Sequence, residues 1–364
     1  MGAHAHTGRP ACDVPRSRSL STSGRFAREI LLAAVICSLF CLPSTLFAQV
    51  ARQLDVSGDA QDARNEALLA MPNLTTPVPL SNLYSTAPGL ESQIPAPQWR
   101  FNLLAPLGYN SNAEEIARSG TQTLETTPIG NLSLAAPVGY LPFRVTVNAN
   151  AESDRYFRAP DEDLDKLGAS VRVQYINPTN DQAFSPYFAV APRWNFLPTF
   201  SDQISARQDF NLGFNKTFNF DGGLSPVPSA SNTSASTVWS FGLTAFIQRR
   251  LREPQDSSSA VFVIPSVSYV ISKEWNASFA VEFLGRWFDS SSLGSSARDL
   301  EALPVGTLEY VIPSFLFGSE RMANAVGRPT LDFQASYLKV WSSFAGATFN
   351  QWTASATLKM GWRF

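Results

Sequence analysis

The sequence predicts an all-β fold, an antiparallel up-and-down β-barrel of about 12 strands (about 10 to 14) that crosses a membrane. Three observations predict it. Apolar residues occupy every second position along much of residues 99–364, so successive side chains would line opposite faces of a strand. The alternating segments run about ten to fourteen residues, where strands of soluble proteins average about five or six. Aromatic residues gather at the segment ends, and only 16% of all residues are charged.

The final segment, residues 350–364, shows the pattern most clearly. One face would carry Trp352, Ala354, Ala356, Leu358, Met360, Trp362 and Phe364. The other would carry Gln351, Thr353, Ser355, Thr357, Lys359, Gly361 and Arg363. One set is apolar and the other is small, polar or charged, which predicts a strand between a hydrocarbon phase and water.

The remaining strands are predicted from the same period of two. Apolar faces begin at Trp99, Phe143, Leu167, Phe210, Trp239, Val261, Trp275 and Leu331. Weaker alternation marks Leu132–Tyr140, Tyr187–Phe196 and Gly306–Leu316. An even strand number places both chain ends on the same side, which we expect to be the periplasm.

The expected connections alternate in length. Long outer loops are predicted at Asn110–Thr123, Ser153–Asp165 and Asp289–Pro304, and short turns at Leu141–Pro142 and Ser272–Glu274. Two connections, Asp221–Thr237 and Ser319–Thr330, are long where a short turn is expected.

A secreted soluble β-protein also alternates, and it stays open as an alternative fold. The polar face argues against it, because its Asn, Gln, Arg and Lys side chains would lack partners in a dry core. Aromatic pairs at strand ends argue for a membrane, whose interfaces attract such rings. The expected interface aromatics are Trp99, Tyr109, Trp275, Trp287, Trp352, Trp362 and Phe364.

The N-terminal 98 residues divide into two predicted parts. Residues 1–48 combine an arginine-rich start, the apolar stretch Ile30–Leu42 and a small residue before Gln49, which predicts a secretory signal peptide. Residues 49–98 contain six prolines from Pro72 to Pro97 and predict an extended periplasmic segment, with a plug inside the barrel as the alternative.

Strand pattern and ending together resemble the outer-membrane β-barrel proteins of Gram-negative bacteria, porins and channels included, without indicating a particular family. The aromatic Phe364 and Trp362 are similar to the signal that barrel-assembly machinery reads on such proteins. The resemblance implies location in the cell outer membrane, with contacts to its lipid and lipopolysaccharide. The sequence does not fix the number of subunits, and we expect a monomer.

No catalytic, cofactor or metal site is predicted. Every cysteine and histidine lies in residues 1–41, so the exported chain would lack thiolates and imidazoles. The resemblance implies a histidine in the active site of barrel enzymes, so we expect no enzyme. A formal net charge of −2 without a basic stripe also argues against nucleic-acid binding.

The predicted polar face supplies the candidate functional residues. By parity the lumen carries eight basic residues and four acidic ones, so we expect a channel for small hydrophilic solutes that favours anions or acidic sugars. Two alternatives stay open: charged pairs such as Arg286 with Glu282 that only fill the interior, and a non-conducting barrel that binds another envelope component. The lumen candidates are Arg100, Arg144, Arg172, Arg193, Arg286, Glu282, Asp209, Asp332 and Lys359, with Arg250, Arg363 and Glu152 on the same face.

Overall fold

The computed structural model describes residues 97–113, 120–138, 141–176, 184–220, 238–254, 257–272, 274–289, 298–343 and 347–364. The predicted signal peptide and nearly all of the proline-rich segment lie outside these described residues. So do Asp221–Thr237 and residues 114–119 of the expected loop at Asn110–Thr123.

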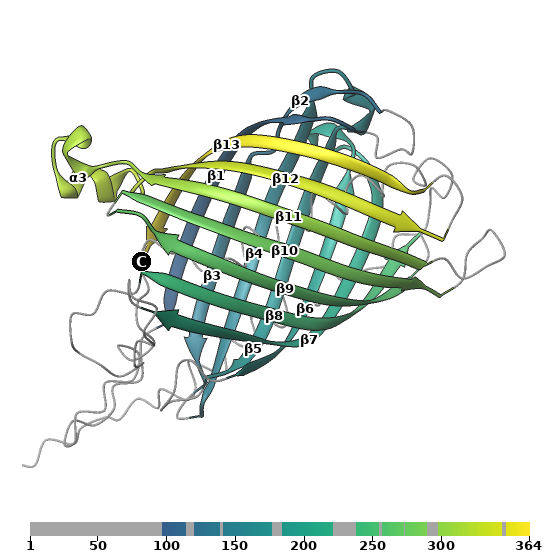
Figure 1. Cartoon of the computed structure of the whole chain (residues 1–364), viewed down its shortest axis with the longest axis horizontal. Helices are drawn as coiled ribbons and strands as arrows, with labels where there is room; N and C mark the ends of the chain where they lie inside the picture. Colours follow the sequence, from purple (N-terminus) through teal and green to yellow (C-terminus); the bar gives the residue numbers. More distant parts are fainter. Residues whose placement is uncertain are drawn as a thin grey trace, which may run out of the picture. The chain divides into compact units, whose positions relative to one another are not determined.

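Thirteen β-strands account for most of the described chain (Figure 1). Their bounds are β1 Gln98–Asn110, β2 Thr123–Thr126, β3 Ile129–Pro137, β4 Phe143–Tyr156, β5 Leu164–Tyr175, β6 Ser185–Phe196, β7 Gln203–Phe220, β8 Trp239–Glu253, β9 Ser258–Val270, β10 Trp275–Phe288, β11 Arg298–Val311, β12 Thr330–Ser342 and β13 Phe349–Arg363. The short helices are η2 Pro160–Glu162, η3 Pro198–Phe200, η4 Ser314–Phe317 and α3 Glu320–Ala325.

The sheet is antiparallel throughout and closes on itself, because β13 pairs with β1. Strands β2 and β3 both lie between β1 and β4, so they share one place in the barrel. The barrel therefore has twelve strand positions, as predicted, and closure leaves no exposed sheet edge. Backbone hydrogen bonds between Trp99 and Phe364 join the start of β1 to the last residue at one rim, which we name the termini end.

The structure corrects the bounds of the least regular strand. Residues 289–304 were expected to form a long loop, but β11 begins at Arg298. Alternation fails there because Leu303 and Val305 share a face with Asp299 and Glu301. A second irregularity is the register shift between β6 and β7 at Asn195 and Phe196.

The wall has two faces of different chemistry. All eight tryptophans of the chain lie on one face, and most of the large exposed hydrophobic side chains of the strands share that face, among them Leu107, Leu212, Ile247 and Leu300. The opposite face holds buried charged residues such as Lys166 and Asp209. In a closed barrel the enclosed side chains lose solvent contact, so the polar face is the inner one.

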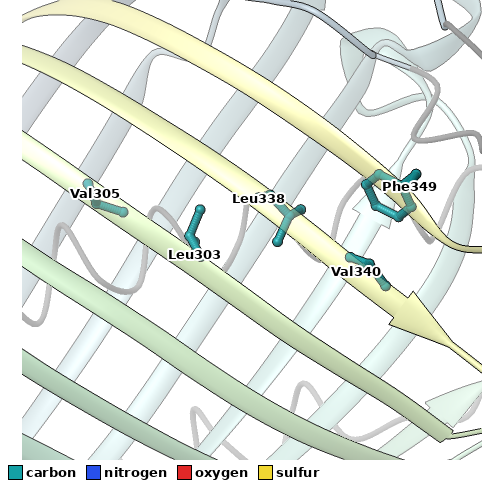
Figure 2. Close-up of a cluster of buried hydrophobic side chains, with 5 residues drawn as sticks. All are labelled: Leu303, Val305, Leu338, Val340 and Phe349. Carbon is teal, nitrogen blue, oxygen red and sulfur yellow. The ribbon is translucent and has the colours of Figure 1, made fainter.

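Part of the inner face is apolar, which the strict alternation did not predict. Leu303, Val305, Leu338, Val340 and Phe349 form one buried cluster across β11, β12 and β13 (Figure 2). A second cluster, on β8, β9 and β10, stacks Phe246 on Phe262 with ring centroids 4.3 Å apart beside Leu284 and Ala260.

The connection between β11 and β12 holds η4 and α3, at the termini end (Figure 1). The part of this connection that follows α3 is hydrogen-bonded to the last strand, since Gly361 N donates to Gly327 O at 2.7 Å. Within the described part of the chain, we find no helix that has the length and apolarity needed to span a membrane.

Candidate functional site

The strand register places the predicted lumen residues on the inner face. Arg100, Arg144, Arg172, Arg193, Asp209, Glu282, Arg286, Asp332 and Lys359 all belong to it. Arg363 pairs with Arg100 in the backbone register, and its side chain lies outside the described part of the structure.

The inner face also carries charges that the sequence pattern missed, which corrects the expected ratio of eight to four. Counting described side chains, the strands present ten basic and nine acidic residues inward. The additional members are Lys166, Arg207 and Arg252 among the basic residues and Glu125, Asp154, Asp299, Glu301 and Glu309 among the acidic residues. The described side chains of the inner face are therefore nearly neutral in sum.

These charged residues form two belts, which differ in their position along the barrel axis. The termini-end belt is the set of charged inner-face residues within six positions of the strand ends at the termini end. Its members are Arg100, Arg144, Arg172, Lys359, Glu309 and Asp332. The opposite-end belt holds the other charged inner-face residues, which are Glu125, Glu152, Asp154, Lys166, Arg193, Arg207, Asp209, Arg250, Arg252, Glu282, Arg286, Asp299 and Glu301.

Lys166 is the most deeply buried member of the opposite-end belt. Its side chain is 0% exposed, and its Nζ lies 2.6 Å from Asp154 Oδ2 and 3.1 Å from Glu152 Oε1. Both carboxylates come from β4 and the amine comes from β5, with Lys166 directly opposite Glu152 in the register and diagonal to Asp154. A buried cation needs such partners, because removing it from water costs several kcal/mol that only close opposite charges offset.

A second buried group joins β7 to β8. Arg250 donates from Nε to Asp209 Oδ1 at 2.8 Å and from its terminal nitrogen to Oδ2 at 3.1 Å. This two-point geometry is the strong form of an arginine–carboxylate pair. Arg207 Nε approaches the same carboxylate at 3.4 Å.

Arg286 lies in the opposite-end belt as well, 3.7 Å from Glu301 Oε1 across the β10–β11 pair. The sequence suggested Glu282, four residues along the same strand, as its partner, and that pairing stays a prediction.

Two arginines of the termini-end belt, Arg144 and Arg172, are half-buried and contact neutral groups. The guanidinium of Arg172 lies 3.7 Å from the centre of the Tyr187 ring. With the Asn215 amide turned so that its oxygen faces Arg172, that oxygen accepts a hydrogen bond at 2.7 Å. Arg144, on the neighbouring strand, donates to Gln174 Oε1 at 3.2 Å.

The acidic members of the termini-end belt lie on the far side of the barrel from Arg172. Glu309 on β11 accepts a hydrogen bond from Asn276 Nδ2 at 3.2 Å. Asp332 on β12 forms an ion pair with Lys359 of β13. Six strand positions separate β5 from β11, so Glu309 lies on the wall opposite Arg172.

The aromatic residues predicted for a membrane interface lie on the outer face, at the two rims. Trp99, Trp275, Trp362 and Phe364 belong to the termini end, and Tyr109, Trp287 and Trp352 belong to the other end. Several contact neighbouring rings in a tilted arrangement, as Trp275 does with Tyr310 and Trp352 with Tyr337, with ring centroids 4.7 and 4.5 Å apart.

The basic run at residues 249–252 splits between the two faces. Arg250 and Arg252 face inward, whereas Arg249 faces outward and forms an ion pair with Asp289. The hydrogen bond from Arg249 holds the pKa of the Asp289 carboxyl below its ordinary value. This exposed pair lies on the outer face, at the rim opposite the termini end.

Residues 97–364 contain neither histidine nor cysteine. Across the described ranges, no group of three or more acidic, cysteine or histidine residues has the geometry to hold a metal ion.

A closed twelve-position barrel with an aromatic-rimmed apolar exterior and a charged interior defines an outer-membrane β-barrel. No family model and no curated relative matches the chain. Solved structures similar to it include the translocator domain of the autotransporter NalP from Neisseria meningitidis, which is 10% identical over 86% of this chain and 100% of that one, with a TM-score of 0.40.

Two further likenesses concern channels. An outer membrane channel from Pseudomonas putida F1 is 10% identical over 76% of this chain and 99% of that one, with a TM-score of 0.41. An anion-selective porin from Comamonas acidovorans is 10% identical over 73% of this chain and 100% of that one, with a TM-score of 0.31. At these values the likeness is one of fold alone.

Proposed function

We propose that this outer-membrane barrel is a channel for small hydrophilic solutes that favours anions or acidic sugars. In this proposal both chain ends lie in the periplasm, lipid and lipopolysaccharide surround a monomer, and the chain carries out no catalysis. The rim aromatics then meet the two lipid headgroup regions.

One observation carries the anion preference: the termini-end belt has four basic and two acidic members, and Arg172 is half-buried among neutral groups. The opposite-end belt has six basic and seven acidic members, and its pairs are largely buried. A neutralised pair projects little field, whereas an arginine with neutral partners keeps its positive potential. Basic side chains placed along a pore favour anions for that reason.

The test is ion selectivity in a planar lipid bilayer across a salt gradient. Arg172→Gln should lower the anion preference of the channel, because Gln keeps hydrogen-bonding groups and loses the charge. Two unit charges about 4 Å apart in water interact by about 1 kcal/mol, so we expect a change of up to about fivefold.

Lys216→Gln is the matched control, because Lys216 lies on the outer face and should leave selectivity unchanged. Equal shifts in both variants would contradict a role for the inner belt.

The second candidate is a non-conducting barrel that binds another envelope component. The buried ion pairs and apolar clusters of the inner wall favour it, because they resemble a packed interior more than a water-lined passage. A purified protein that inserts into bilayers without conductance above background would establish this candidate and remove the first.

A further inference from the structure

The β11–β12 connection exposes large apolar side chains at the termini end. Phe315 is 75% exposed, Leu316 is 61% exposed and Met322 is 53% exposed. Phe315 and Leu316 belong to η4, and Met322 belongs to α3. Apolar side chains that are this exposed on a short, ordered segment indicate an interaction surface.

The connection is held on the outer side of the closing strand. Trp362 Nε1 donates a hydrogen bond to Ala325 O, the last residue of α3, at 3.0 Å. The same tryptophan lies on the outer face, stacked on Phe101 with ring centroids 5.6 Å apart. Trp362 therefore places the end of α3 beside the apolar exterior of the barrel, at the level of its aromatic rim.

Specific hydrogen bonds, an ion pair and a glycine turn hold this segment in its conformation. Ser319 caps α3 by accepting a hydrogen bond from Met322 N at 3.2 Å, and Arg328 bridges to Glu320 at 3.0 Å. Gly327 adopts a φ of 79°, and a Cβ there would lie 2.9 Å from both Gly361 N and the Trp362 ring. Only glycine combines this backbone conformation with so close an approach.

We propose that residues 314–325 form an interfacial anchor, in which Phe315, Leu316 and Met322 insert into the headgroup–acyl boundary of the leaflet at the termini end. The occupant is phospholipid. The reason is continuity: the anchor is tethered to a tryptophan of the lipid-facing rim, and such rings mark the headgroup level. Short apolar segments beside that level bury their side chains in the interface.

The experiment places a fluorescent thiol label on single cysteines in a full-length background with Cys12, Cys37 and Cys41 replaced by alanine. Phe315→Cys in η4 is the test position, and Arg321→Cys in the neighbouring α3 is the control because Arg321 is exposed but polar. The proteins are reconstituted in phosphatidylcholine–phosphatidylglycerol vesicles, and circular dichroism verifies the barrel. Quenching by doxyl-labelled lipid reports lipid contact, and quenching by iodide reports water contact.

We expect lipid quenching at residue 315 to exceed that at residue 321 several-fold, and iodide quenching to show the reverse. Trp362→Phe keeps the ring and removes the donor to Ala325, so it should reduce lipid quenching at residue 315. Equal iodide access at both positions would overturn the proposal. So would a label at 315 shielded from both quenchers, since protein would then cover this surface.

Discussion

The two ends of the inner wall are built from the same residue types in different ways. At the opposite end Lys166 and Asp209 are fully buried and held by close ionic partners. At the termini end Arg144 and Arg172 are half-buried and contact an amide and a phenol ring. Under the proposed function, charge on the inner face has two uses, since one arrangement links neighbouring strands and the other leaves a positive potential for solutes.

The fastening role predicts the largest effect. Lys166→Met should lower the free energy of unfolding by about 3 to 5 kcal/mol, because Glu152 and Asp154 stay buried without their cation. Urea unfolding in detergent micelles, followed by tryptophan fluorescence, measures the change.

The matched control replaces all three groups with neutral ones, as Lys166→Met, Glu152→Gln and Asp154→Asn. It should recover most of the loss, because neutral side chains avoid the cost of burying charge. A single variant as stable as the parent would show that this end of the barrel is well hydrated, and the contrast between the ends would disappear.

The solute-facing role predicts an intermediate effect at Glu309. Glu309→Gln should raise the anion preference by up to about fivefold, because it removes one of two acids from the termini-end belt. Reversal potentials in planar bilayers measure it. Glu253→Gln is the control, since Glu253 is exposed on the outer face. A fall in anion preference would contradict the proposed electrostatics.

The smallest change in stability is expected when a hydrogen bond between two neutral side chains is removed at the termini end. Asn148 Nδ2 donates to Ser170 Oγ at 2.9 Å in a half-buried site. Asn148→Ala should cost less than about 1 kcal/mol of unfolding free energy, because water can replace the lost partner. The same urea titration checks it, and a loss as large as that of Lys166→Met would mean that the two ends do not differ.

Sequence periodicity was enough to predict the barrel, because a two-residue period over long segments has few other physical causes. Strand number, closure by the last segment and the outward direction of the tryptophans all follow from which side of each strand is apolar. The bounds of β11 were missed because Leu303 and Val305 face inward beside acids, so the polarity of its two faces does not alternate.

The sequence predicted which residues face the interior of the barrel, but it did not predict which of them contact each other. The parity of each strand places Arg172 and Asp209 on the inner face, but the ion pairs depend on register between strands. Lys166 was missed because it lies at the start of β5, in residues expected to belong largely to a loop. The two belts could not be predicted because they are defined by distance from the strand ends, and alternation does not locate those ends accurately.

The barrel closes where β1 pairs with β13, and these two strands are the most distant in sequence of all the strands in the barrel. Arg100 is paired with Arg363, and Trp99 exchanges backbone bonds with Phe364. Such a contact costs much loop-closure entropy before any bond forms, so topology predicts slow folding. A nascent chain that lacks its final strand would have two unpaired edges, which makes closure a late, all-or-none step of biogenesis.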